Sequence, residues 1–282
     1  QYQIAATPEM IKLLSGEFYE MPSDAPHANT IAQGVDKGLK LLDMRGLSYD
    51  DPKWEEYLSQ MTIDELLSQL PEGAGTQSVI SVNKPDTSAG DGIDGINGKL
   101  PYGDKPYCQT YCSKVVLSST WNKDVMRRRG ELMGEEALFR SMVAIWSVGG
   151  DLHLTPFGGR NFEYISEDGV FNYLVAIPET QGCQSKGVSS AVKHFAGNDQ
   201  EFHREGVNMF FNEQFFREID LRTFEGGVCE GGSKALMQSL SRLGLIYDPA
   251  SYALNTTVLR EEWGFDGIDQ TDGTAGSTHK QH

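Results

Sequence analysis

The sequence lacks any long run of apolar residues. Its apolar stretches are only a few residues long, whereas a helix that crosses a bilayer needs about 20. We therefore expect a soluble protein with no membrane partner. The chain starts QYQIAATPEM, with neither an initiator Met nor the charged and apolar regions of a signal peptide. We expect the true N-terminus to lie elsewhere.

Basic residues are also few. The chain has 24 Lys and Arg against 40 Asp and Glu, which gives a formal net charge of -16, and no run rich in Lys or Arg interrupts this pattern. Such a negative field disfavours nucleic acid and anionic membranes as partners. A neutral ligand agrees with it better.

Cysteine is scarce and has no paired CxxC spacing. This favours ordinary thiols over a zinc site or a disulfide framework, and no metal is predicted. The cellular compartment stays open, with the cytoplasm slightly favoured over secretion. The four cysteines are Cys108, Cys112, Cys183 and Cys229.

No glycine-rich phosphate loop follows any strand-like segment. The glycines around Cys229 and Glu230 belong to a helix-to-strand turn, so they do not form a dinucleotide or P-loop motif. No cofactor is predicted.

The 282 residues, 39% of them hydrophobic and 10% aromatic, are enough to bury a sizeable core. Residues 1–50 read as a polar lead-in with one helix in TPEMIKLL, where Thr7 is the N-cap and Pro8 the first helical residue. Residues 51–282 carry the patterned domain.

The segment TIDELLSQL opens the patterned domain with a capping box formed by Thr62 and Glu65. Four apolar residues share one helical face and are predicted to lie in the core. They are Ile63, Leu66, Leu67 and Leu70.

Strand-like segments then alternate with helical ones. KVVLSS, MVAIW, SSAVKHF and KALMQSL read as strands, and WNKDVMRRRGELMGEEAL, NEQFFREIDLRTF and YALNTTVLREEW as helices, before a last strand in GFDGIDQTD. This alternation predicts a parallel sheet with covering helices, either a barrel or a doubly wound sheet. We favour an α/β fold of the (β/α)8 type, a TIM-like barrel. Only about six strands are convincing against the eight of a closed barrel, so the barrel is expected to be incomplete or truncated.

In a barrel, polar residues at the C-terminal ends of strands line the active site. Cations, an imidazole and carboxylates at one mouth would suit a polyhydroxylated ligand. The alternative, that each is a solvated loop charge or a structural ion pair, stays open. The candidates are Lys193 and His194 in AVKHFAGNDQEFHR, Arg160, Glu163 and Asp168 in PFGGRNFEYISED, and Asp272 after the last strand.

Five segments in order resemble the barrel domain of glycoside hydrolase family 3, of the β-glucosidase type: SSTWNKD, TPFGGRNFEYISED, KHFAGNDQE, NEQFFREIDL and VLREEWGFDGIDQTD. The lead-in from Asn29 resembles members in which the sandwich domain precedes the barrel. The resemblance implies a linker in residues 1–50, a barrel domain in residues 51–282, and a second, sandwich domain in the full-length protein.

The resemblance also implies the roles of the site residues. Asp272 matches the nucleophile of a retaining β-glycosidase, which attacks the anomeric carbon of a terminal β-linked glucosyl residue and forms a covalent aspartyl intermediate. The carbohydrate substrate would be bound through its hydroxyls by Asp91 of DGIDGING together with Arg160, Lys193 and His194.

Some positions depart from the family pattern. They are Ile93 after Asp91–Gly92, Leu154 in place of an Arg, Leu240 and Ser241 in place of an aromatic and Asn, and Gly273 in place of an aromatic after the nucleophile. Most members take the acid/base Glu from the second domain. Within this chain, the candidates would be Asp199, Glu201 and His203, although loop packing explains Glu201 and His203 better.

Two other functions stay open. One is a catalytically incomplete, sugar-binding barrel fragment that lacks its acid/base domain. The weaker one is a metal-dependent barrel hydrolase that uses His153, His194 and His203, which is disfavoured because neither an HxH pair after a first strand nor an HExxH motif is present.

Overall fold

A computed structural model describes residues 6–15, 23, 33–70, 75–96 and 108–273. The chain divides into two compact units, Tyr19–Ala89 and a unit made of Gln1–Phe18 with Gly90–His282. The division between residues 1–50 and 51–282 stays a prediction. The predicted first helix is confirmed, since α1 (Pro8–Ser15) begins at Pro8 and the Met10 N–H donates to Thr7 Oγ1 at 3.2 Å.

The unit Tyr19–Ala89 is small and has its own core. Met44, Tyr57, Met61, Val79 and Val82 are buried together. Its elements are a 3₁₀ helix (Leu41–Met44), α2 (Lys53–Leu58), α3 (Ile63–Leu67), β1 (Gly75–Thr76) and the first part of β2 (Thr87–Asp91), which pairs antiparallel with β1.

The capping box of α3 is confirmed, but the prediction that its apolar face lies in the core is wrong. Glu65 N–H donates to Thr62 Oγ1, and Thr62 N–H donates to a Glu65 carboxylate oxygen. Only Leu66 packs against the core, whereas Leu67 is 56% and Leu70 67% exposed. The helix ends at Leu67, so it is too short to place Leu70 on the same face.

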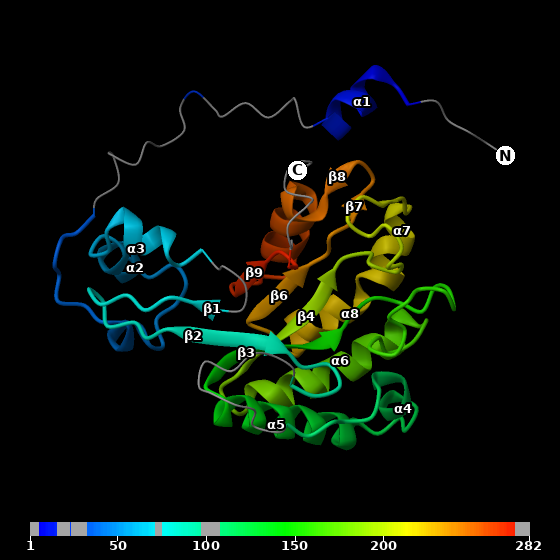
Figure 1. The fold of residues 1–282 in the computed structure, drawn as a ribbon, viewed down its shortest axis with the longest axis horizontal. Coiled ribbons are helices and arrows are strands. Elements are labelled where there is room, and N and C mark those ends of the chain that lie inside the picture. The colour runs from blue at the N-terminus through cyan, green and yellow to red at the C-terminus, as the bar shows by residue number, and fades with distance from the viewer. Residues whose placement is uncertain (1–5, 16–22, 24–32, 71–74, 97–107, 274–282) are drawn as a thin grey trace. The chain divides into compact units, whose positions relative to one another are not determined.

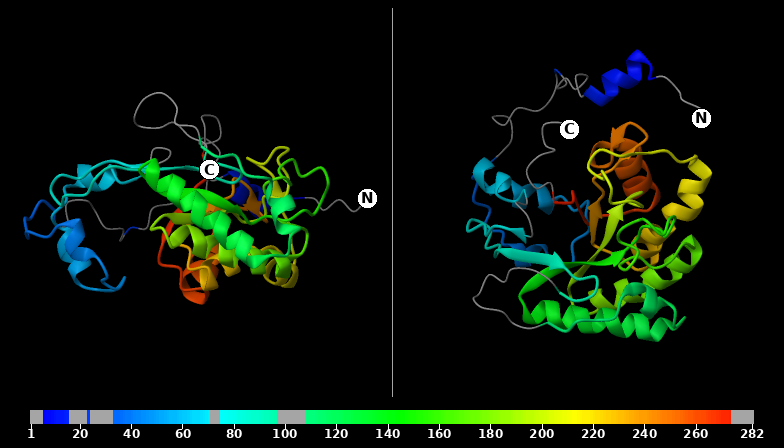
Figure 2. Two further views of the ribbon diagram at one scale, coloured as in Figure 1. Left: turned by 90° about the horizontal axis from the view of Figure 1, so that it is seen from below. Right: turned by 45° about the vertical axis from the view of Figure 1, so that its right-hand side comes forward.

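A curled, mainly parallel sheet forms the unit that contains Gly90–His282. Its strands are β3 (Met142–Gly149), β4 (Ser189–Phe195), β6 (Ala235–Gln238) and β9 (Ile268–Gln270), adjacent in that order and parallel. The end of β2 lies beside β3, where the Gly92 N–H donates to the Trp146 carbonyl at 3.0 Å. The described strands thus form part of a TIM-like barrel, as predicted (Figures 1 and 2).

Helices cover the strands. α5 (Lys123–Phe139) packs on β3 and on α6 (Gly169–Gln184), and α6 in turn packs on β4 and on α8 (Arg222–Glu225), as Figure 1 shows. The other elements of this unit are α4 (Lys114–Ser118), α7 (Glu213–Phe215), π-helical segments at Phe216–Asp220, Gly226–Glu230 and Ala253–Glu262, a 3₁₀ turn at Asp248–Ala250, and a small sheet of β5 (Asn208–Met209), β7 (Arg242–Leu243) and β8 (Ile246–Tyr247).

The central strand β4 explains the position of the core. Its residues from Ser190 to Phe195 are all buried, as expected for a parallel strand that is covered on both faces. Val192 and Phe195 belong to the main core cluster with Phe224 and Leu236 from neighbouring elements. The strand therefore brings Lys193 and His194 into the interior at its C-terminal end.

The segment KVVLSS is helical, so the prediction of a strand there is wrong. It forms α4, and its first residue, Lys114, is fully buried and paired with Glu179 of α6. A short apolar run does not distinguish a strand from a buried helix by periodicity alone. The buried ion pair is a tertiary contact that local sequence does not reveal.

Within the described residues, no helix combines the length and apolar character needed to cross a membrane.

Candidate active site

The ends of β2 and β4 meet through an ion pair. Lys193, whose side chain is 4% exposed, places its Nζ 2.6 Å from Asp91 Oδ1 and 3.8 Å from Glu163 Oε2. Asp91 is the last residue of β2 and its side chain is 55% exposed. The buried ammonium is thus held by one carboxylate inside and one carboxylate at the surface.

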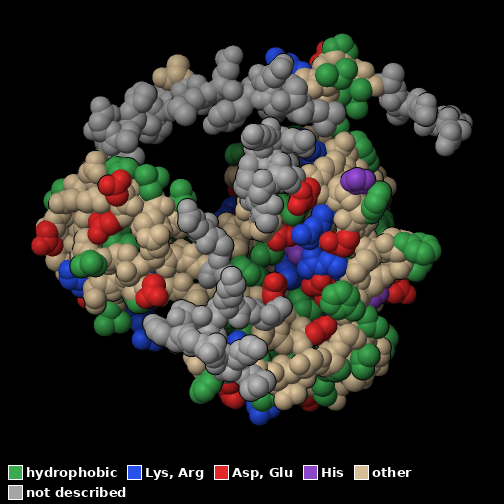
Figure 3. Space-filling model, viewed as in Figure 1, with side chains coloured by type: hydrophobic (Ala, Val, Ile, Leu, Met, Phe, Trp, Pro, Cys, Tyr) green, Lys and Arg blue, Asp and Glu red, His purple; other side chains and the backbone are tan. Residues whose placement is uncertain are grey.

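Arg160 extends this network along the loop after β3. Its Nε donates to Glu163, and its guanidinium also lies 3.5 Å from Glu201 Oε1. Glu201 lies on the loop after β4 and pairs in turn with Arg204 at 3.3 Å. Figure 3 shows Lys and Arg side chains gathered with Asp and Glu side chains on this face.

Asp272 follows the last strand. β9 ends at Gln270, and the side chain of Asp272 is 17% exposed. Its Oδ2 lies 3.8 Å from His194 Nε2 and 3.5 Å from Arg204 Nη1, and its Oδ1 accepts the Gly273 N–H at 2.6 Å. The carboxylate therefore faces an imidazole and a guanidinium.

The structure brings together all five residues that the sequence singled out for the site. Asp91, Arg160, Lys193 and Asp272 are linked by ion pairs through Glu163, Glu201 and Arg204. His194 joins them through its ring nitrogen, 3.8 Å from Asp272. Asp168, also considered, is not part of this network in the described contacts. It is the N-cap of α6 and accepts the Phe171 N–H at 2.9 Å.

Sequence reasoning missed Asp151, Tyr164 and Arg204. Asp151 is fully buried two residues after β3, and it accepts the backbone N–H groups of His194 and Asn198 at 2.9 Å each. Its position just beyond a predicted strand was the available signal, because barrel sites gather at such strand ends. Tyr164 and Arg204 lie within the quoted segments PFGGRNFEYISED and AVKHFAGNDQEFHR, but nothing local distinguished them from their neighbours.

Burial and charge set the protonation of this region. Burial raises the pKa of Asp151 to about 6, although the N–H groups of His194 and Asn198 oppose this rise. Burial, together with the charges of Arg160 and Lys193, holds the pKa of His194 well below its usual range. His194 is therefore a neutral imidazole at neutral pH.

The three acid candidates on the loop after β4 differ in their surroundings. Glu201 is paired with Arg160 and Arg204 and accepts from Asn198 Nδ2 at 2.9 Å. Asp199 is buried, its pKa is raised to about 7 by burial, and it accepts the Leu152 N–H. His203 is exposed.

The departures from the family pattern have distinct environments. Ile93, Leu240 and Ser241 are buried, whereas Leu154 is 44% exposed. A side chain at Gly273 would meet no described atom within 4 Å of its Cβ, so the backbone leaves room for one there.

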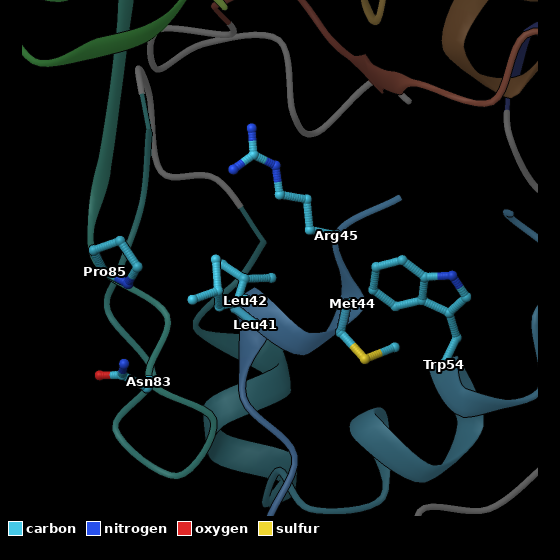
Figure 4. A pocket seen from close by; sticks show the side chains of 7 residues that line it. All are labelled: Leu41, Leu42, Met44, Arg45, Trp54, Asn83 and Pro85. Carbon is cyan, nitrogen blue, oxygen red and sulfur yellow. The ribbon is translucent and has the colours of Figure 1, made fainter. Parts of the chain in front are cut away.

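Other sites are less suited to chemistry. The described residues hold no group of three or more His, Cys, Asp and Glu side chains arranged to bind a metal. The unit Tyr19–Ala89 has a mostly apolar surface pocket of about 440 Å³ (Figure 4). It is lined by Leu41, Leu42, Met44, Arg45, Trp54, Asn83 and Pro85.

A parallel barrel sheet with carboxylates, cations and an imidazole at its strand ends is the arrangement of a barrel enzyme. A family model described as the glycosyl hydrolase family 3 N terminal domain matches residues 108–280. The chain belongs to glycosyl hydrolase family 3.

Relatives and solved structures agree with this assignment. A β-glucosidase of Rhizobium radiobacter is 33% identical over 77% of this chain and 27% of its own length. An exo-α-(1->6)-L-arabinopyranosidase of Bifidobacterium longum is 33% identical over 76% of this chain and 30% of its own length. The structure of β-glucosidase 3B from Thermotoga neapolitana in complex with glucose is 33% identical, with a TM-score of 0.74 over 79% of this chain and 34% of that one. The chain thus spans about a quarter to a third of the length of these proteins.

Proposed function

We propose that this chain carries the nucleophile and the sugar-binding part of the active site of a retaining β-glycosidase. The observation that carries the proposal is the position of Asp272 just after a parallel barrel strand, facing His194 and Arg204. The substrate would be a terminal β-linked glucosyl residue, in keeping with the names of several relatives.

In this mechanism Asp272 attacks the anomeric carbon, and the bond to the leaving group breaks as the covalent aspartyl intermediate forms. Water then releases the sugar. Arg204, 3.5 Å from Asp272 Oδ2, orients the carboxylate.

Asp91, Lys193, Arg160 and His194 bind the sugar hydroxyls in this proposal. Their hydrogen bonds would be charge-assisted at three of the four positions, and such bonds are about twice as strong as neutral ones. Lys193 and Arg160 are largely buried and already fixed by Glu163. They would therefore lose little side-chain freedom when the sugar binds.

The acid/base carboxyl, we propose, comes from a second, sandwich domain of the full-length protein, with residues 1–50 as a linker and residues 51–282 as the barrel domain. A retaining enzyme needs its two carboxyl groups about 5 to 5.5 Å apart. Glu201 is occupied by two Arg side chains, which suits a positioning role better than proton donation.

The substitution Asp272→Asn tests the nucleophile. It keeps the shape of the side chain and removes the charge, so release of dinitrophenol from dinitrophenyl β-glucoside should fall by at least about a thousandfold, the scale of a lost nucleophile. The measurement is the rate of dinitrophenol release, together with far-UV circular dichroism to verify folding.

Asp266→Asn is the matched control. Asp266 lies two residues before β9, where its carboxylate pairs with the exposed Lys234 at 2.5 Å, and its substitution should leave the rate unchanged. A parental rate in Asp272→Asn would refute the nucleophile assignment. Glucose binding without any turnover in the parent would favour the catalytically incomplete, sugar-binding fragment instead.

A further inference from the structure

Asp151 contacts the imidazole of His194 on the Nδ1 side, whereas Asp272 lies on the Nε2 side. Asp151 Oδ2 lies 2.9 Å from the backbone nitrogen and 3.2 Å from Nδ1 of His194, while its Oδ1 accepts the Asn198 N–H. Asp151 and His194 are both at most 1% exposed. The imidazole is therefore fixed by a single carboxylate that also holds the backbone on both sides of Phe195.

When Asp151 is ionised, the hydrogen bond between its Oδ2 and His194 Nδ1 can form in only one direction. A carboxylate can only accept, so the hydrogen atom between the two groups must sit on Nδ1. A neutral imidazole carries one N–H, and the partner of one nitrogen decides which nitrogen carries it. Nε2, on the side of Asp272, is then a bare acceptor.

Tyr164 is the competing partner of the same nitrogen. Its hydroxyl lies 3.3 Å from Nδ1, but it has the Asn198 carbonyl at 3.5 Å as an acceptor and also stabilises the charge of Asp151. The Asn198 amide donates to the Tyr164 oxygen at 3.1 Å. The phenol proton thus has acceptors other than His194.

We propose that Asp151 is a positioning residue that holds His194 in the Nδ1–H tautomer, so that Nε2 accepts a hydrogen bond from a sugar hydroxyl beside Asp272. Nε2 and Asp272 Oδ2 are both acceptors and stand 3.8 Å apart. They repel each other unless a donor lies close to both. A ligand hydroxyl is such a donor, whereas an ether or a deoxy position is not.

The role in binding rests on the proposed function, but the tautomer does not. Long-range ¹H–¹⁵N NMR of the full chain distinguishes a protonated from a bare ring nitrogen, and His194→Gln assigns the resonances. We expect a protonated Nδ1 and a bare Nε2 in the parent near neutral pH. A protonated Nε2 would overturn the proposal whether or not the chain turns over substrate.

Asp151→Asn then tests the positioning role. Its amide can donate to Nδ1, which shifts the ring proton to Nε2, so glucose affinity measured by calorimetry should fall about tenfold, equivalent to ~1.4 kcal/mol. The NMR signature should switch in the same sample. Unchanged tautomer and affinity in this variant would show that Asp151 acts on the fold alone.

Asp199→Asn is the matched control. Asp199 is also buried and also accepts a backbone N–H in this region, from Leu152 at 3.0 Å, but no described contact joins it to His194. We expect parental tautomer and affinity in this variant. If the tautomer of His194 also switches in Asp199→Asn, the switch in Asp151→Asn reflects a general disturbance of the buried region, which contradicts the role of Asp151. If Asp151→Asn does not fold, the tautomer of the parent still decides the proposal.

Discussion

At the scale of single residues, burial and ion pairing hold charged side chains in fixed positions. Lys193 lies at the end of a strand that is covered on both faces, and Asp91 and Glu163 compensate its charge. A buried charge is tolerated only when it is paired or hydrogen-bonded. The pairs that keep this ammonium in the interior therefore also fix its position between Asp91 and Glu163.

Removing either cation should weaken sugar binding more than folding. In Lys193→Ala, Glu163 keeps Arg160 as a partner and Asp91 is partly exposed, so no buried charge is left alone. We expect Lys193→Ala and Arg160→Ala each to weaken glucose binding by about 1.5 to 3 kcal/mol, the range for hydrogen bonds to charged groups. Isothermal titration calorimetry measures the glucose affinity of each variant.

Lys234→Ala is the control for these two variants, because Lys234 is exposed and pairs with Asp266. Its affinity for glucose should equal that of the parent. If both Lys193→Ala and Arg160→Ala also bind glucose like the parent, these cations are structural ion pairs and the proposed sugar subsite is wrong.

At the scale of elements, a buried ion cluster joins three helices. Lys114 of α4 and Arg129 of α5 both contact the carboxylate of Glu179 of α6, and all three side chains are at most 1% exposed. Burial, followed by the charge of Arg129, lowers the pKa of Lys114 to about 8. Asp94, which is partly exposed, also lies 3.6 Å from Arg129. Glu179 is thus the fully buried carboxylate that the two cations share.

The two sides of this cluster should respond unequally to substitution. Glu179→Gln leaves two buried cations without their shared carboxylate and should lower the free energy of unfolding by about 3 to 5 kcal/mol. Lys114→Met should cost clearly less, because Glu179 keeps Arg129 and the apolar side chain fills the site. Urea unfolding followed by circular dichroism gives both values.

Glu131 of α5, which is partly exposed and pairs with the exposed Arg127 and Arg128, serves as the control. Glu131→Gln should change the free energy of unfolding by at most about 0.5 kcal/mol, as surface pairs do. Equal losses in Glu179→Gln and Lys114→Met would contradict the role of Glu179 as the shared anion.

At the scale of the whole molecule, some of the 40 acidic side chains behind the formal net charge of -16 are buried. Asp199 and Asp220 are both buried and interact with each other, and burial raises the pKa of Asp199 to about 7 and that of Asp220 well above its usual range. The nearby charge of Asp151 acts in the same direction. The protein therefore carries carboxyl groups that are better accommodated as neutral acids.

This predicts a stability that decreases as the pH rises. A carboxyl with a raised pKa in the folded state contributes stability that is complete below its unfolded pKa and is lost as the pH rises through its folded pKa. For Asp199 this window extends from its ordinary value of 3.8 up to about 7. Urea midpoints should therefore fall between about pH 5 and pH 8 through this pair.

Asp220→Asn should remove much of this fall, because it deletes one of the two interacting charges. We expect it to raise the free energy of unfolding at about pH 8 by about 1.4 kcal/mol, the equivalent of one pKa unit, and to have less effect at about pH 5. Asp266→Asn is the control, because the hydrogen bond from Lys234 lowers its pKa instead. If stability falls with pH as steeply in Asp220→Asn as in the parent, the fall does not come from the pair Asp199 and Asp220.

The proposed division of the active site between domains also has a kinetic consequence. If the acid lies outside this chain, dinitrophenyl β-glucoside should still glycosylate Asp272, since its leaving group needs little protonation, whereas an alkyl glucoside should be inert. Added azide should then accelerate release of the intermediate. Equal rates on both substrates, lost in Glu201→Gln or His203→Ala, would place the acid within this chain.

Local signals in the sequence determined several features by themselves. The caps at Thr7 and Thr62 depend on residues three positions apart, and the strand SSAVKHF is an apolar run of the right length and type, so short-range chemistry suffices for them. Asp91, Arg160, Lys193, His194 and Asp272 could be grouped as one site from their strand ends and from family motifs. Parallel strands bring their C-terminal ends to one edge without further information.

The tertiary structure decided what depends on partners far along the chain. KVVLSS became a helix in which Lys114 meets Glu179, 65 residues away, and Leu67 and Leu70 stayed exposed because their helix ended early. The contact of Asp151 with His194, 43 residues apart, could not be read from either segment. Burial and hydrogen bonding between distant segments set protonation, tautomer and orientation, and the one-dimensional pattern of residues carries no record of these distances.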